Sequence, residues 1–145
     1  MLNDLYNQKI LELAGNIPVM ERIKDCDVSS MKHSKLCGSK VSVDLKLDGD
    51  VVTDYAHDVN ACMLGQAACS IMAQHIVGSS RSELFNLRDA VSAMLKSGGA
   101  PPSGKWGDIA ALQPVKDVKA RHASTLLVFD AVCDALEQIS ESEAV

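Results

Sequence analysis

Aromatic side chains are scarce in this chain. They make up 3% of its 145 residues, and Trp106 is its one tryptophan. The core must therefore be built mainly from aliphatic residues, which contribute to a hydrophobic content of 47%. The charged fraction of 23% is typical of a globular chain rather than a disordered one. This length fits one core of ordinary size, so we expect residues 1–145 to form a single domain.

Basic stretches and long apolar runs are also missing. A net charge of −5 without a basic segment argues against a nucleic-acid partner. The sequence contains no run of about 18 apolar residues, the length that would predict a membrane span. Its first residues lack the basic, apolar and small segments of a signal peptide. We therefore expect a cytoplasmic protein with no membrane partner. No internal repeat, phosphate loop or dinucleotide fingerprint is present.

The chain has five cysteines. In a reducing compartment this number does not indicate a disulfide framework. Cys133 follows the apolar side of a helical pattern that includes Leu126 and Phe129, so we interpret it as a buried core residue.

A β-hairpin is the clearest local prediction. Residues 41–48 alternate between apolar and polar side chains, which predicts a half-buried antiparallel strand. Asp48-Gly49-Asp50 supplies the turn, and residues 51–57 return as the partner strand. A shorter strand is expected over residues 27–32. Helices should cover only the face that carries Val41, Val43 and Leu45, leaving the other face in water.

Helical periodicity or composition predicts four helices. Asp58 or Asn60 is expected to cap the helix over residues 61–77, which is rich in small residues. Ser80 and Glu83 form a capping box at the start of the helix over residues 80–95. Trp106 is expected to anchor the Gly/Pro-rich loop over residues 97–107. The four predicted helices span residues 2–13, 61–77, 80–95 and 124–139.

Cys37 and Cys62 flank the predicted hairpin. Because a hairpin returns the chain, residues at its two ends can lie close in space. Cys62 also stands where a helix begins, and a helix N-terminus favours a thiolate. Two thiols held in this way suit metal binding or sulfur transfer.

Several motifs share an order and spacing with one known family. They are Leu36-Cys37-Gly38, Ala61-Cys62 before the small-residue helix, residues 107–112, and Arg121-His122-Ala123-Ser124. Together they resemble the iron–sulfur cluster assembly scaffold family, the group of IscU and the NifU N-terminal domain, and are most similar to its SufU branch. The resemblance covers nearly the whole chain. It implies an α+β fold, a small antiparallel β-sheet with helices packed on one face.

The resemblance also implies a degenerate metal site. The family uses three cysteines and an aspartate, but Ser39 stands at the aspartate position and Ser124 at the third cysteine position. A neutral serine is a poor ligand for zinc or iron. Cys37 and Cys62 remain as ligands, and His122 is a candidate replacement ligand.

Other side chains could also approach this site. His33 and His57 flank the hairpin. Cys69 lies two helical turns beyond Cys62, about 10 Å along the axis, which is too far to share one metal ion. With so few ligands, we expect a low metal affinity and a protein that can be metal-free as purified.

Three functions stay open from the sequence. The first is a scaffold that binds iron, an iron–sulfur cluster or zinc through Cys37 and Cys62. The resemblance implies that it accepts sulfur, with Cys62 as acceptor, from a cysteine desulfurase and serves cluster-recipient proteins. The second is a non-catalytic interaction or regulatory protein of the same fold. The third is a thiol enzyme with Cys62 as nucleophile and His122 as base, for which no substrate pocket is specified; we therefore favour a scaffold over an enzyme.

Overall fold

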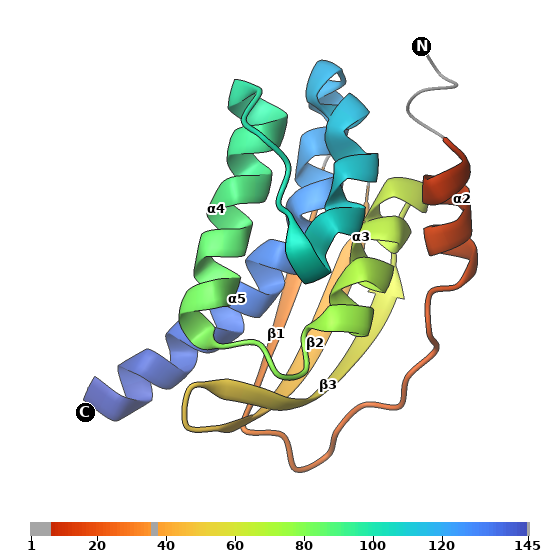
Figure 1. The fold of residues 1–145 in the computed structure, drawn as a ribbon. Helices are drawn as coiled ribbons and strands as arrows, with labels where there is room; N and C mark the ends of the chain where they lie inside the picture. Colours follow the sequence, from red (N-terminus) through yellow and green to blue (C-terminus); the bar gives the residue numbers. More distant parts are fainter. Residues whose placement is uncertain (1–6, 36–37, 145) are drawn as a thin grey trace.

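A three-stranded antiparallel sheet forms one layer of the protein (Figure 1). The computed structural model describes residues 7–35 and 38–144, and side chains up to residue 139. The strands are β1 (Val28–His33), β2 (Lys40–Asp48) and β3 (Val51–Asn60), paired in the order β1-β2-β3. The turn between β2 and β3 places Gly49 at a φ of 60°, a value that glycine adopts without strain. The predicted hairpin is confirmed, and its second strand is three residues longer than expected.

Helices form the second layer. In Figure 1, α3 and α5 lie against the sheet, α4 packs beside α5, and α2 packs beside α3. This arrangement confirms the predicted α+β fold with its helices on one face. The helices are α2 (Gln8–Gly15), α3 (Met63–His75), α4 (Arg81–Ser97) and α5 (His122–Ala144), with 3-10 helices η1 (Gly104–Asp117) and η2 (Lys119–Arg121). None of the helices in the described ranges is both long enough and apolar enough to cross a bilayer.

The inner face of the sheet is apolar, as the alternation predicted. Val41, Val43 and Leu45 have no exposed surface. Leu45 pairs with Tyr55 across the hairpin, and Tyr55 is also buried on this face. Burial of these side chains against α3 and α5 stabilises the two layers by removing apolar surface from water.

The outer face is less exposed than the sequence predicted, because the segment between α2 and β1 covers part of it. Asp44 is only 1% exposed. Its carboxylate accepts two hydrogen bonds of 2.7 Å from the Arg22 guanidinium and one from the backbone N–H of Ile23. The hydrogen bond to Arg22 is the main reason that the pKa of Asp44 is lowered. The expectation of a fully wet face was wrong, since alternation does not reveal what a loop will cover.

Two local predictions on α4 are confirmed. The Ser80 side chain accepts a hydrogen bond from the Glu83 backbone N–H at 3.2 Å and caps the helix. Trp106 is 5% exposed, and its indole N–H donates to the Glu83 carboxylate at 2.8 Å. The indole therefore anchors its segment to α4. That segment is not a loop throughout, because η1 begins at Gly104.

Candidate functional site

Cys62 occupies the N-cap position of α3, two residues after the end of β3. The sequence predicted Asp58 or Asn60 as the cap, but both belong to β3, which extends further than alternation alone indicated. The Cys62 side chain itself does not cap the helix by a hydrogen bond. The half-buried Cys62 side chain therefore lies at a helix N-terminus, where the helix dipole favours negative charge.

Two serine hydroxyls meet at Cys62. The Cys62 thiol donates to Ser124 Oγ at 3.5 Å, and the Cys62 backbone N–H donates to Ser39 Oγ at 3.4 Å. Ser39 directly precedes β2, and Ser124 lies in the first turn of α5. Ser39 is 3% exposed and Ser124 is 1% exposed. The structure therefore joins three of the residues that the sequence singled out, from three separate elements.

Gly65 permits this close approach of α3 and α5. A Cβ atom at Gly65 would lie 2.9 Å from the Ala61 Cβ and 3.3 Å from the Ser124 backbone oxygen. Both distances are shorter than an ordinary van der Waals contact. Sequence reasoning did not single out Gly65 as a site residue. The available signal was a glycine inside a helix, three residues after Cys62.

His122 is turned toward η1. Its Nε2 donates to the backbone oxygens of Val115 at 3.0 Å and Lys116 at 3.1 Å. Two carbonyl oxygens require that Nε2 carries the proton, so this nitrogen is not free to bind a metal ion in the arrangement seen here. His122 as a replacement ligand stays a prediction, and it would need Nδ1 or a rotated ring.

The other described candidate residues have different surroundings. His57 Nε2 donates to the Pro18 backbone oxygen at 2.9 Å, and its Nδ1 accepts from the Tyr55 hydroxyl at 3.0 Å. His33 is exposed at the end of β1. Cys69 is completely buried, and burial raises the pKa of its thiol. Cys37 lies outside the described residues.

The described side chains do not form a preassembled metal site. No group of three or more His, Cys, Asp or Glu residues within the described ranges is placed to hold a metal ion. Among the described residues, the groups gathered at Cys62 are its own thiol and the hydroxyls of Ser39 and Ser124. A resident zinc ion takes four ligands from thiolate, imidazole and carboxylate groups, so this set does not fit one.

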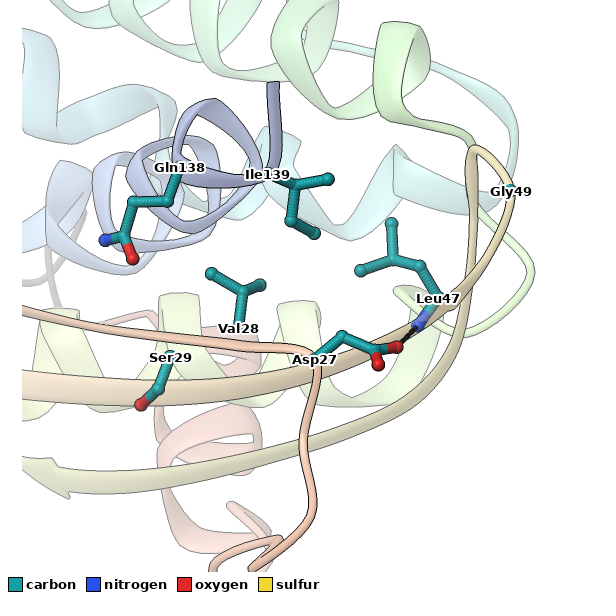
Figure 2. Close-up of a pocket in the computed structure, with 7 residues that line it drawn as sticks. All are labelled: Asp27, Val28, Ser29, Leu47, Gly49, Gln138 and Ile139. Atoms are coloured by element: carbon teal, nitrogen blue, oxygen red, sulfur yellow. Dashed lines mark hydrogen bonds between the residues drawn. The ribbon is translucent and has the colours of Figure 1, made fainter. Parts of the chain in front are cut away.

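A separate cavity lies at the opposite end of the sheet. Figure 2 shows it between the β2–β3 turn and the last turns of α5. Its volume is about 570 Å³. The Asp27 carboxylate in its wall already accepts a hydrogen bond of 2.8 Å from the Leu47 backbone N–H (Figure 2). Neither a thiol nor an imidazole lines this cavity, so it does not offer the chemistry of the Cys62 site.

Comparisons with known proteins identify the family. The chain belongs to the NifU-like N-terminal domain family, whose match spans residues 5–125. The family predicted from the sequence is thus confirmed. The match includes Ser39, Cys62 and Ser124, so the residues that meet in space lie within the family domain.

Three similar proteins illustrate the relationship. The zinc-dependent sulfurtransferase SufU of Bacillus subtilis is 30% identical over 131 residues, which is 90% of this chain and 88% of that protein. The iron–sulfur cluster assembly scaffold protein IscU of Thermotoga maritima is 26% identical over 136 residues, 94% of this chain and 95% of that protein. The crystal structure of a nitrogen-fixing NifU-like protein (N-terminal) from Brucella abortus has a TM-score of 0.94 and 50% identity, and covers 97% of both chains.

Proposed function

We propose that this protein acts in iron–sulfur cluster assembly as a scaffold-type protein that accepts sulfur on Cys62. The sulfur donor is a cysteine desulfurase, and the recipients are proteins that receive sulfur or a cluster. Family membership supports this role, as do the names of the relatives, which include a scaffold protein and a sulfurtransferase.

One observation carries the proposal. The half-buried Cys62 thiol lies at the N-terminus of α3 and contacts Ser124 Oγ at 3.5 Å. A helix N-terminus is a position that favours an anionic group, and the thiol is only half-buried, so a donor protein can approach it. Cys69 and Cys133 have at most 1% of their surface exposed and cannot meet a donor protein, whereas Cys26, on the segment before β1, is partly exposed but does not stand at a helix N-terminus.

The transfer step needs only the two sulfur partners. Cys62 first loses its proton to solvent, and its thiolate attacks the outer sulfur of a persulfide on the donor. A new S–S bond forms at Cys62 Sγ while the S–S bond of the donor breaks. The donor leaves as a thiolate, so the exchange requires no external oxidant or reductant.

Iron or a nascent cluster is the cargo of such a scaffold. We propose that Cys37 and Cys62 bind it, because thiolates are the usual protein ligands of iron–sulfur clusters. Ser39 and Ser124 are neutral and contribute less binding energy than the carboxylate and thiolate expected for the family. A weakly held cargo would suit release to a recipient.

Sulfur mapping tests the proposal. The reduced protein is incubated without oxygen with L-cysteine and the cysteine desulfurase encoded in the same genome, and its intact mass and peptides are measured. We expect one or more added sulfur atoms on the Cys62 peptide in the wild type and in Cys69→Ala. Cys62→Ala should gain no sulfur.

Two outcomes would contradict this function. Sulfur that appears on Cys37 in both the wild type and Cys62→Ala would show that the acceptor is misassigned. A wild type that binds the desulfurase and changes its rate without gaining sulfur would instead support the non-catalytic regulatory protein.

A further inference from the structure

A second hollow lies beside the Cys62 site, on the other side of the first turns of α5. It is bounded by the end of β1, the end of α4 and the start of α5, and its volume is about 600 Å³. Lys32, Lys96 and Lys119 line it, against one carboxylate, that of Asp130. A basic hollow on a chain with a net charge of −5 is a local reversal of charge.

The ammonium groups of this hollow are largely available. Lys96 and Lys119 are exposed, and neither forms an ion pair with a carboxylate in the described part of the chain. Lys32 contacts the Asp134 carboxylate at a distance of 3.8 Å, and 43% of its side chain is exposed. Exposed charges at a rim steer and select a partner more than they hold it.

The floor of the hollow has a different character. Leu126 and Leu127, each no more than 6% exposed, form it beside the exposed methyl group of Ala123. Burial raises the pKa of Asp130, although Arg88, Lys32 and Lys96 act in the opposite direction. An anion placed deep in this hollow would meet apolar side chains and a carboxyl group, whereas an anion at the rim would meet lysines.

We propose that this hollow binds an acidic segment of a partner protein, in which carboxylates flank an apolar side chain. The apolar side chain would cover Leu126 and Leu127, and the flanking carboxylates would reach Lys32, Lys96 and Lys119. A small free anion fits less well, because the lysines lie on three separate elements and the floor offers no buried cation.

The hollow and the thiol site share structural elements. Ala123 in the hollow directly precedes Ser124, which contacts Cys62. At the β1 side of the hollow, the Ser34 backbone N–H donates to the Ser39 backbone oxygen at 2.8 Å. A segment bound here would hold its protein next to Cys62. This last step rests on the proposed function, whereas binding of the segment does not.

A peptide array tests the binding. The full chain is applied at low salt to short immobilised peptides in which Leu or Phe is flanked by Asp or Glu, with Lys-flanked and Ser-flanked sets as controls. Affinities of the best peptides are then measured by fluorescence anisotropy. We expect the acidic set alone to bind, and Lys96→Glu with Lys119→Glu to weaken binding by roughly tenfold or more.

Matched variants separate the site from general electrostatics. Lys24→Glu makes the same charge change as Lys96→Glu alone, at an exposed lysine on the α2–β1 segment, and should retain the affinity that Lys96→Glu weakens. Ala123→Trp should fill the hollow and weaken binding without a change of charge. Sulfur transfer to Cys62 from a small persulfide should be unchanged in the lysine variants, so that failure of docking is distinguished from failure of the proposed function.

Several results would overturn this proposal. They are an acidic set that does not bind at all, equal losses in Lys24→Glu and Lys96→Glu, and free glutamate or inorganic phosphate competing at the same concentration as the peptide. Self-association that the peptide abolishes would overturn it in favour of a second copy of this chain.

Discussion

The start and the middle of α3 each carry a cysteine, and the two thiols differ in how deeply they are buried. At the start, Cys62 is half-buried, its thiol donates to the Ser124 hydroxyl, and its backbone N–H donates to the Ser39 hydroxyl. In the middle, Cys69 has no exposed surface, and burial together with the nearby charge of Cys62 raises the pKa of its thiol. One residue type on one helix is therefore available for chemistry at one position and part of the core at the other.

The difference follows from what packs around each turn. The first turn emerges from β3 at the edge of the core, where β2 and α5 also begin. The middle of the helix lies over the sheet, and Tyr55 beneath it is 3% exposed. Position along the helix, rather than local sequence, thus decides which thiol is accessible to solvent, and burial disfavours the thiolate of Cys69.

The largest expected contrast is in alkylation. With iodoacetamide at about pH 8, Cys62 of the native protein should react at least roughly 100-fold faster than Cys69 and Cys133, because both of the latter are buried and disfavoured as thiolates. The pKa of Cys133 is raised to about 12. Peptide mapping after timed quenching measures the rates. Equal labelling of Cys62 and Cys69 in the native protein would show that the two thiols do not differ in accessibility.

Gly65→Ala tests the close packing at the start of the helix. Its Cβ would crowd the Ala61 methyl group and the Ser124 backbone oxygen, so α3 and α5 must separate. We expect a loss of about 1–3 kcal/mol in the free energy of unfolding by urea, reduced by the better helix propensity of alanine. Gly15→Ala in α2 is the control, since nothing lies within 4 Å of its Cβ. Equal stability of the two variants would show that the contact is not tight.

The smallest expected effect is the pH dependence of stability that His57 confers. Burial is the main reason that the pKa of His57 is lowered, while its hydrogen bond to Pro18 acts in the opposite direction. The unfolded chain therefore binds this proton more readily, and stability is lost as the pH falls below about 6.5 through the folded pKa.

His57→Gln should remove that loss. Between about pH 7 and 5, the wild type should lose more free energy of unfolding than the variant. Asp44 and Asp134 do not account for the difference, because their lowered pKa values affect stability only at more acidic pH. Parallel pH curves for the two proteins would contradict a neutral, buried His57.

Local patterns predicted the parts of the fold that local physics decides. Period-two alternation located the hairpin, and the spacing of Ser80 and Glu83 located the start of α4. The contact of Arg22 with Asp44 was not predictable in this way, since it joins residues 22 positions apart across the outer face of the sheet. Long-range polar contacts leave no periodic signal in the sequence.

The candidate site was also predictable only in part. Motif spacing singled out Cys62, Ser39 and Ser124, and the structure brings these three together. The same reasoning could not predict that Cys62 itself is the N-cap, because this depends on where β3 ends. Nor could it foresee that His122 bonds to the end of η1, a helix that the sequence did not predict.

We propose that Ser39 and Ser124 stand at two ligand positions around Cys62. Zinc titration against a competing chelator, comparing the wild type with Ser39→Asp combined with Ser124→Cys, measures whether they do. We expect weak zinc binding by the wild type and an increase by orders of magnitude in the double variant, since the two added anionic ligands would complete a tetrahedral set with Cys37 and Cys62. A double variant that binds zinc no better than the wild type would show that Ser39 and Ser124 do not stand at ligand positions.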